Sequence, residues 1–327
     1  MKAIISRETL FTAVAGHSRG VLRFALVLFA GIFFLAGCSD LKNNSLPTPP
    51  ALTVHPPEWS DAASPGFHGV VLGAEHYDWA TCGRCHAKNF EGGTSGVSCE
   101  ASGCHVSANG TQKSPESCNT CHGSFRAEAS DTLSWAPPRA VNGDTITTSR
   151  GVGAHQVHVN ADASGQRVEC KECHTVPTEV FQAGHLDASA SAKVVFNGTR
   201  AVTVTANGTL VPHPSYDPAA LQCSNTFCHG NWKALKSSAP TINQQFYSDS
   251  VMVGNNDSPQ WTGGASQAAC GTCHGLPPQG HVPLAGNLAG AKCSDCHQGV
   301  VDANNNILNT GLHMNGKIDV FSTERSF

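Results

Sequence analysis

The sequence is poor in methionine, in charged and aromatic side chains and in long apolar runs. Only three of its 327 residues are methionine, 13% are charged and 7% are aromatic. Its formal net charge of −4 excludes the basic surface by which proteins bind nucleic acid. In contrast, 15 cysteines and 17 histidines give the chain an unusual content of metal ligands. We therefore expect something other than side-chain packing to fill much of the interior.

The amino terminus is typical of an export signal. Two arginines precede an apolar run over residues 24–35, which is too short to span a bilayer as a helix. The run ends in Leu35-Ala36-Gly37-Cys38, which resembles the bacterial lipobox, in which the cysteine is lipidated. We predict a lipoprotein signal peptide over 1–37, and a lipidated Cys38 that begins a proline-rich tether over 38–57. An ordinary secretory signal with an incidental cysteine is the alternative.

The other fourteen cysteines form seven pairs, and a histidine directly follows every pair. Five pairs have the form C-x-x-C-H: Cys82, Cys85 and His86; Cys118, Cys121 and His122; Cys170, Cys173 and His174; Cys270, Cys273 and His274; and Cys293, Cys296 and His297. Two are stretched to C-x-x-x-x-C-H: Cys99, Cys104 and His105; and Cys223, Cys228 and His229.

The short motif is typical of covalent attachment of c-type haem. One helical turn places two thiols and an imidazole on a shared face, so that the cysteines bond the porphyrin edge and the histidine reaches the iron. In the stretched form two extra residues have to loop out, which Gly103 eases in the first of them. We predict seven haem c groups, with the fourteen cysteines as thioether links and the seven following histidines as proximal ligands.

Paired cysteines have two other common uses. Exported proteins often join them in disulfides, but a disulfide has no use for a histidine after every pair. Structural zinc also uses C-x-x-C pairs, but it needs two such half-sites for each metal ion. The histidine that follows every cysteine pair therefore favours haem attachment over disulfides and over zinc.

The second axial ligand separates an electron carrier from a haem enzyme. Beyond the initiator, only Met252 and Met314 are available, so histidine–methionine ligation cannot be general. Nine histidines lie outside the motifs and the signal peptide: His55, His68, His76, His155, His158, His185, His213, His281 and His313. Nine candidates can serve seven irons, which favours bis-histidine ligation without an open position for a substrate.

The order of the motifs indicates a duplication. Motifs one to three run short, long, short, and motifs four to six repeat this order. We predict a three-haem module over residues 58–160 and a four-haem module over 161–327, the second with a β-hairpin insertion at about 194–211. The expected fold is a mostly irregular multihaem cytochrome c with short helical turns at the motifs, that minor β-hairpin and a core of stacked haems.

The alternation of stretched and short motifs resembles the outer-surface multihaem cytochromes of Geobacter-type metal-reducing bacteria. Four further stretches are similar to segments of that family, namely residues 55–59, Gly92-Gly93, Cys223-Ser224-Asn225 and residues 313–316. The resemblance implies an exported electron carrier, often a lipoprotein, that passes respiratory electrons to extracellular acceptors. It also implies seven distal ligands: His55, His68, His155, His158, His185, His281 and His313.

These features predict an electron carrier rather than an enzyme, although non-specific reduction of metals is compatible with it. We expect lipid anchoring at the outer membrane, on its periplasmic or cell-surface face. The expected partners are other redox proteins, such as multihaem cytochromes or a porin, and Fe(III) or Mn(IV) oxides or chelates. Two alternatives remain open: a nitrite- or hydroxylamine-type oxidoreductase with one open haem site, and the haem component of a porin–cytochrome conduit or filament.

Overall fold

A computed structural model describes residues 54–101, 103–160, 165–187 and 192–327. The expected signal peptide, Cys38 and most of the tether lie outside this part of the chain. The contacts between residues divide the protein after Gly66 into two units, residues 1–66 and 67–327. The second unit includes all seven cysteine motifs, and its division into two modules after residue 160 stays a prediction.

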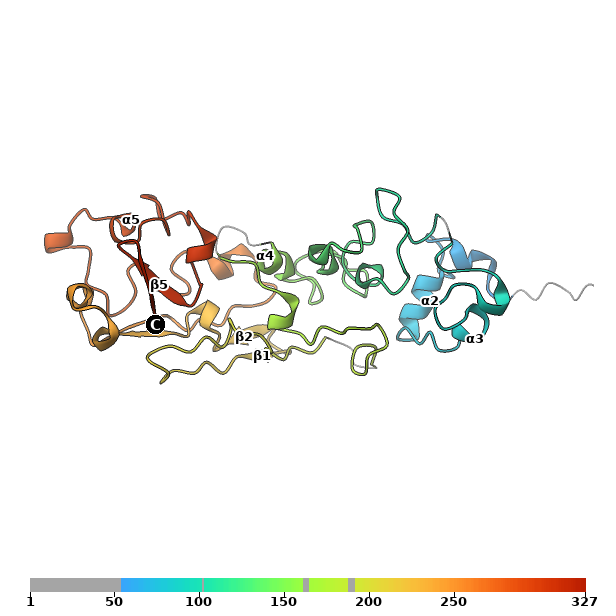
Figure 1. Ribbon diagram of the computed structural model, residues 1–327, viewed down its shortest axis with the longest axis horizontal. Helices are drawn as coiled ribbons and strands as arrows, with labels where there is room; N and C mark the ends of the chain where they lie inside the picture. The colour runs from blue at the N-terminus through green and yellow to red at the C-terminus, as the bar shows by residue number, and fades with distance from the viewer. Residues whose placement is uncertain (1–53, 102, 161–164, 188–191) are drawn as a thin grey trace, which may run out of the picture. The chain divides into compact units, whose positions relative to one another are not determined.

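Most of the described chain is irregular, as predicted, with short helices and strands between long loops (Figure 1). The α-helices are α2 (His68–Ala74), α3 (Gly83–His86), α4 (His155–Val159) and α5 (Cys293–Cys296). The 3-10 helices are η2 (Pro57–Ser60), η3 (Gly93–Ser95), η4 (Cys118–Thr120), η5 (Thr132–Trp135), η6 (Cys170–Glu172), η7 (Phe227–His229), η8 (Lys236–Ser238), η9 (Thr241–Phe246), η10 (Ala265–Ala268), η11 (Gly286–Leu288) and η12 (Thr310–Leu312). None of the helices in the described residues is long and apolar enough to cross a membrane.

The strands form three separate antiparallel pairs. They are β1 (Ser215–Asp217) with β2 (Gln222–Ser224), β3 (Lys233–Leu235) with β4 (Val251–Val253), and β5 (Lys317–Val320) with β6 (Thr323–Ser326). Strand β2 carries Cys223, which lies opposite Tyr216 of β1. In the last pair Ile318 lies opposite Arg325. The first strand pair therefore includes a motif cysteine, and the last strand pair lies in the segment that follows the seventh motif.

The region predicted as a hairpin insertion, about 194–211, contains a single antiparallel bridge between Thr205 and Leu210. Its first half stays irregular because the carboxylate of Glu172 accepts hydrogen bonds from the backbone N–H groups of Thr199 and Arg200, at 3.1 and 3.0 Å. Those N–H groups are then not available to a strand ladder. The Asn-Gly turn signal at 207–208 does close the bridge, but the paired strands form elsewhere.

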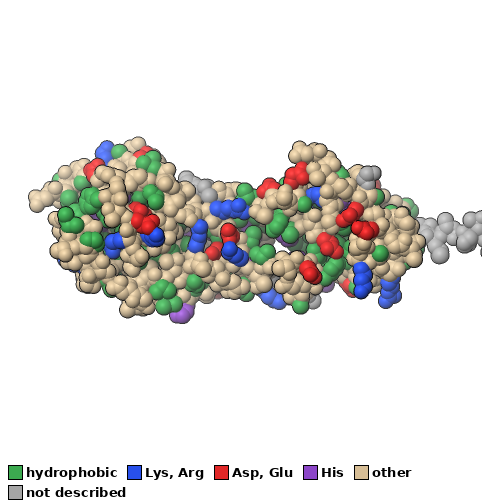
Figure 2. Space-filling model, in the orientation of Figure 1, with side chains coloured by type: hydrophobic (Ala, Val, Ile, Leu, Met, Phe, Trp, Pro, Cys, Tyr) green, Lys and Arg blue, Asp and Glu red, His purple; other side chains and the backbone are tan. Residues whose placement is uncertain are grey.

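The protein has a small side-chain core. Among the described residues thirteen hydrophobic side chains are buried, whereas sixteen large hydrophobic ones are exposed. Hydrophobic side chains are accordingly visible at many points of the face shown in Figure 2. The three largest side chains below 2% exposure are Val152, Asn119 and Thr205, of which two are polar. The side chains alone thus bury little apolar surface, as the composition predicted.

Candidate functional site

Five of the seven cysteine motifs contain a helical turn, formed by α3, α5, η4, η6 or η7. In three short motifs the backbone N–H of the histidine donates to the carbonyl of the first cysteine, four residues back. This hydrogen bond sets His86, His174 and His297 on the same side of the turn as the cysteines. The first stretched motif loops out at Gly103, with φ +97°, as predicted, and the second does so at Asn225, with φ 57°.

None of the fourteen motif cysteines, all of which lie in the described part of the chain, forms a disulfide. Burial raises the pKa of the Cys173 thiol to about 12 and that of Cys228 to about 11. Burial therefore favours the protonated thiol at both positions. Protonated thiols held in pairs are suited to thioether formation, in which the S–H adds across a vinyl group.

Five motif histidines are oriented by the backbone. Their ring Nδ1 atoms lie within hydrogen-bond distance of a carbonyl oxygen: His86 of Val97 (2.9 Å), His122 of Trp135 (2.6 Å), His174 of Lys193 (2.8 Å), His274 of Gly275 (2.8 Å) and His297 of Asp319 (2.7 Å). A carbonyl oxygen only accepts, so Nδ1 is the protonated nitrogen and Nε2 carries the lone pair. This tautomer in a fixed orientation is what a metal-ligating histidine needs.

The histidines of the two stretched motifs differ from the others. The Nδ1 atoms of His105 and His229 are buried and have no hydrogen-bond partner among the described residues. Burial lowers the pKa of His229 to about 4, and it also lowers the pKa of His105. Both rings are therefore neutral at pH 7 and retain a lone pair for a metal.

Four of the non-motif candidates are oriented in the same way. Their Nδ1 atoms bond to nearby carbonyl oxygens: His155 to Val152 (2.8 Å), His158 to Ala154 (2.8 Å), His185 to Val180 (2.8 Å) and His281 to Val282 (2.6 Å). Burial lowers the pKa of His155 to about 4, so this ring too is neutral. These four rings are thus oriented as ligands need to be, although His185 is exposed and the other three are only half-buried.

Four motif histidines each lie opposite one non-motif histidine. The ring centroids are 6.1 Å apart for His105 and His68, 6.3 Å for His174 and His155, 6.2 Å for His229 and His158, and 6.5 Å for His274 and His313. Two imidazoles that bind one metal from opposite sides need about 6 Å, because each metal–nitrogen bond is about 2 Å long and each centroid lies about 1 Å behind its nitrogen. The thiol pairs and the spacing of these rings therefore fit c-type haem.

Two further motif histidines have a non-motif histidine as an electrostatic neighbour. Burial lowers the pKa of His122, and His185 lowers it further. Burial likewise lowers the pKa of His297, and His281 adds to this effect.

The remaining three non-motif histidines have other surroundings. His55 lies in the first unit, where its ring stacks on Trp59 at 4.4 Å, and its role as a ligand stays a prediction. His76 and His213, the two histidines outside the predicted ligand set, are both exposed. Among the predicted ligands His185 is exposed as well, so exposure alone does not separate the two sets.

Helix α4 carries two of the opposed histidines three residues apart. His155 faces the fourth motif and His158 the fifth. The indole of Trp261 contacts both rings, with centroids 4.8 and 5.7 Å away, and its Nε1 donates to the carbonyl of Arg150 at 3.0 Å. Sequence reasoning missed Trp261, because nothing in its neighbourhood marks it apart from any other loop aromatic.

Successive motifs lie close together, so that groups in one motif shift pKa values in its neighbour or are joined to it by hydrogen bonds. Burial raises the pKa of several motif thiols, and a cysteine of a neighbouring motif adds to the increase: Cys99 beside Cys82, Cys118 beside Cys170, Cys173 beside Cys223 and Cys228 beside Cys273. His274 similarly contributes to the lowered pKa of His297. The second and third motifs are connected by Lys113, whose N–H donates to the carbonyl of His105 at 2.7 Å and whose Nζ donates to Asn119 at 3.3 Å.

Comparison with known proteins identifies one family. Residues 222–274 match the family described as the Geobacter CxxxxCH...CXXCH motif, and this stretch spans the fifth and sixth motifs. The match confirms the resemblance predicted from the sequence. Neither the curated proteins nor the solved structures include a match to the chain.

Proposed function

From the premise that this chain is a Geobacter-type multihaem cytochrome, we propose that it transfers electrons along seven covalently bound haems. The observation that carries the proposal is the set of four histidine pairs with centroids 6.1–6.5 Å apart. Each pair joins a histidine that follows two cysteines to one from elsewhere in the chain, as bis-histidine ligation requires.

We assign six axial pairs. Four are the opposed rings described above, and two follow from the electrostatic neighbours His122 with His185 and His297 with His281. The assignments use six of the seven predicted distal ligands. Each pairs a proximal histidine with a distal one that lies at least fifteen residues away in the sequence.

The side chains bind and orient, and they perform no bond-making chemistry. Bound haem supplies one-electron Fe(III)/Fe(II) chemistry at each site. Where a motif histidine and a distal histidine together hold the iron, they would leave no position on it for water or a substrate. Nδ1–carbonyl hydrogen bonds orient nine of the proposed ligand rings, so little rearrangement of those rings would oppose electron transfer. This argues for a carrier over the nitrite- or hydroxylamine-type enzyme, which needs an open iron.

The neighbouring motifs supply the route. Groups in neighbouring motifs shift one another's pKa or are joined by hydrogen bonds, in chain order from Cys82 beside Cys99 to His274 beside His297. His155 and His158 bring the fourth and fifth sites to one turn of α4, and Trp261 contacts both of these rings. We propose that electrons move between adjacent sites in this order.

The cellular setting follows from the export signal and the family. We propose that lipidation at Cys38 anchors the protein at the outer membrane, where it receives electrons from other multihaem cytochromes. The acceptors we propose are extracellular Fe(III) or Mn(IV) oxides and chelates, reached directly or through a porin–cytochrome conduit. An exposed low-potential haem reduces soluble chelates without a dedicated pocket, so carrier and metal reductase are two descriptions of one activity.

The proposal predicts seven haems per chain, all low-spin. A pyridine-haemochrome assay on purified protein gives the count, and the EPR spectrum of the oxidised protein gives the spin states. One haem in seven in the high-spin state would indicate an open site and favour the oxidoreductase alternative. A count of five would show that the stretched motifs do not bind haem.

Replacement of Cys38 by alanine is expected to move the protein from the membrane fraction to the soluble fraction, because the anchor depends on acyl chains that each contribute about 0.8 kcal/mol per buried methylene. Fractionation and immunoblotting measure the distribution, with haem content as the control for folding. A variant that stays in the membrane fraction would contradict lipidation at this cysteine.

A further inference from the structure

Trp261 contacts two of the assigned axial ligands at once. Its indole is nearly perpendicular to the ring of His155, with centroids 4.8 Å apart and planes at 89°, and it stacks on the ring of His158 at 5.7 Å and 25°. The Nδ1 hydrogen bonds of the two histidines fix one point of each imidazole. A second ring packed against an imidazole also restricts rotation about its Cβ–Cγ bond, and this rotation sets the plane of the ring.

The indole is itself held by the segment that leads into α4. Its Nε1 donates a hydrogen bond to the carbonyl of Arg150 at 3.0 Å. Gly153 leaves room for the indole, because a Cβ atom at this position would lie 2.0 Å from Nε1. The backbone at Gly153 is also left-handed, with φ +43°. A side chain at position 153 would therefore displace the indole.

The backbone of Trp261 belongs to the surroundings of the fifth motif. Its N–H donates to the carbonyl of Leu221 at 2.6 Å, directly before β2. The N–H of Cys223, on β2, donates to the carbonyl of Pro259 at 3.2 Å. Trp261 therefore extends from a segment that is bonded to the fifth motif and contacts the distal ligands on α4, which comes from a distant part of the sequence.

We propose that Trp261 is a positioning residue for the distal ligands of both the fourth and the fifth haem. The inference rests on the proposed function, since that function assigns His155 to the fourth site and His158 to the fifth. Displacement of the indole releases both imidazoles together, because the same ring contacts both. The fourth and fifth haems therefore respond jointly to a change at Trp261.

The test is Trp261→Leu in the full-length haem-loaded protein, followed by a haem count and EPR of the oxidised protein. The g values of a low-spin haem depend on the orientation of its axial imidazoles. With the count still at seven, we expect two sevenths of the low-spin intensity to move to new g values. Trp261→Phe keeps an aromatic ring but loses the hydrogen bond to Arg150. It should change the same two signals by less, and it decides the matter if the leucine variant does not fold.

Gly153→Ala tests the position of the indole without altering Trp261. We expect it to change the same two signals, and to add no further change to Trp261→Leu. Gly143→Ala is the matched control, because Gly143 is also left-handed, with φ +90°, but has only its chain neighbours within 4 Å of the position that a Cβ would occupy. It should leave all seven signals unchanged. Equal effects of the two alanine variants would attribute the change to backbone strain and overturn the proposal.

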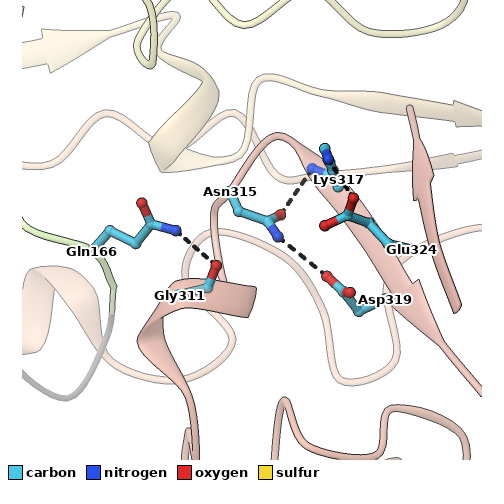
Figure 3. Close-up of polar contacts among 6 residues, drawn as sticks. All are labelled: Gln166, Gly311, Asn315, Lys317, Asp319 and Glu324. Carbon is cyan, nitrogen blue, oxygen red and sulfur yellow. Dashed lines mark hydrogen bonds and ion pairs between the residues drawn. The ribbon is translucent and has the colours of Figure 1, made fainter. Parts of the chain in front are cut away.

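Gln166→Ala is the control for the loss of a contact between distant segments. The side chain of Gln166 donates to the carbonyl of Gly311 at 2.7 Å, two residues before His313 (Figure 3). This contact ends on a main-chain oxygen rather than on a ligand ring, so all seven signals should stay unchanged. The same change as in Trp261→Leu would indicate a general loosening of the loops and refute a specific role of Trp261.

The outcomes separate this proposal from the proposed function. Seven unchanged low-spin signals in Trp261→Leu would refute the positioning role and leave the proposed function intact. A change confined to one haem would also overturn the proposal, because only one imidazole would then depend on the indole. A wild-type protein without haem at the fourth or fifth motif would instead refute the proposed function itself.

Discussion

Replacement of Cys223 and Cys228 by alanine is expected to yield a chain with six haems in place of seven. These thiols belong to a stretched motif, in which Cys223 lies on β2 and Cys228 in the 3-10 turn η7, with the backbone reversing at Asn225. The left-handed backbone at Asn225 turns the chain between the two thiols, which would let the motif take up its two extra residues. A haemochrome assay per mole of chain should fall by one seventh.

The same substitution in a short motif, Cys82 and Cys85 to alanine, is the matched control and should also give six. If the stretched variant keeps the haem count of the wild type while the short one loses one haem, the stretched motif does not attach haem. The loss should also lower the melting temperature, because the side-chain core is small and the haems would supply much of the buried apolar surface.

Replacement of His155 or His158 by alanine is expected to convert one haem each from low-spin to high-spin, and the double variant should convert two. The reason is that these histidines face different motifs, His174 and His229, from one helix. EPR of the oxidised protein measures the high-spin fraction, expected at about one seventh and two sevenths. His213→Ala, at an exposed histidine outside the pairs, should leave the spectrum unchanged.

Combining the two experiments tests the pairing itself. In the six-haem variant that lacks Cys223 and Cys228, adding His158→Ala should produce no further high-spin haem, since its partner site is empty. Adding His155→Ala to that variant should still produce one. The reverse result would show that the two histidines serve each other's assigned sites.

The sequence predicted the parts of the site that depend on local spacing. The turn that joins Cys293 to His297 and the left-handed Gly103 follow from neighbouring residues, and both are present in the structure. The irregular fold was predictable for the same reason, because short motif turns in a chain poor in apolar side chains leave little to build long helices or sheets.

The pairing of ligands was not predictable, because it depends on contacts between distant segments. Nothing local connects His68 to His105 or His313 to His274. The hairpin prediction misplaced the strands for a related reason: Glu172, more than twenty residues away, takes the N–H groups of Thr199 and Arg200.

The hydrogen bonds that orient the imidazoles end mainly on main-chain oxygens, to which His86 adds a contact with the hydroxyl of Ser95 at 3.0 Å. Val97, Trp135, Lys193 and Asp319 contribute only their carbonyl groups, which nearly any other amino acid would also provide. Ring orientation is therefore encoded in the path of the backbone and is insensitive to residue identity at the acceptor. Such a protein can change the sequence of its loops extensively, or accept engineered loop sequences, while its redox centres keep their geometry.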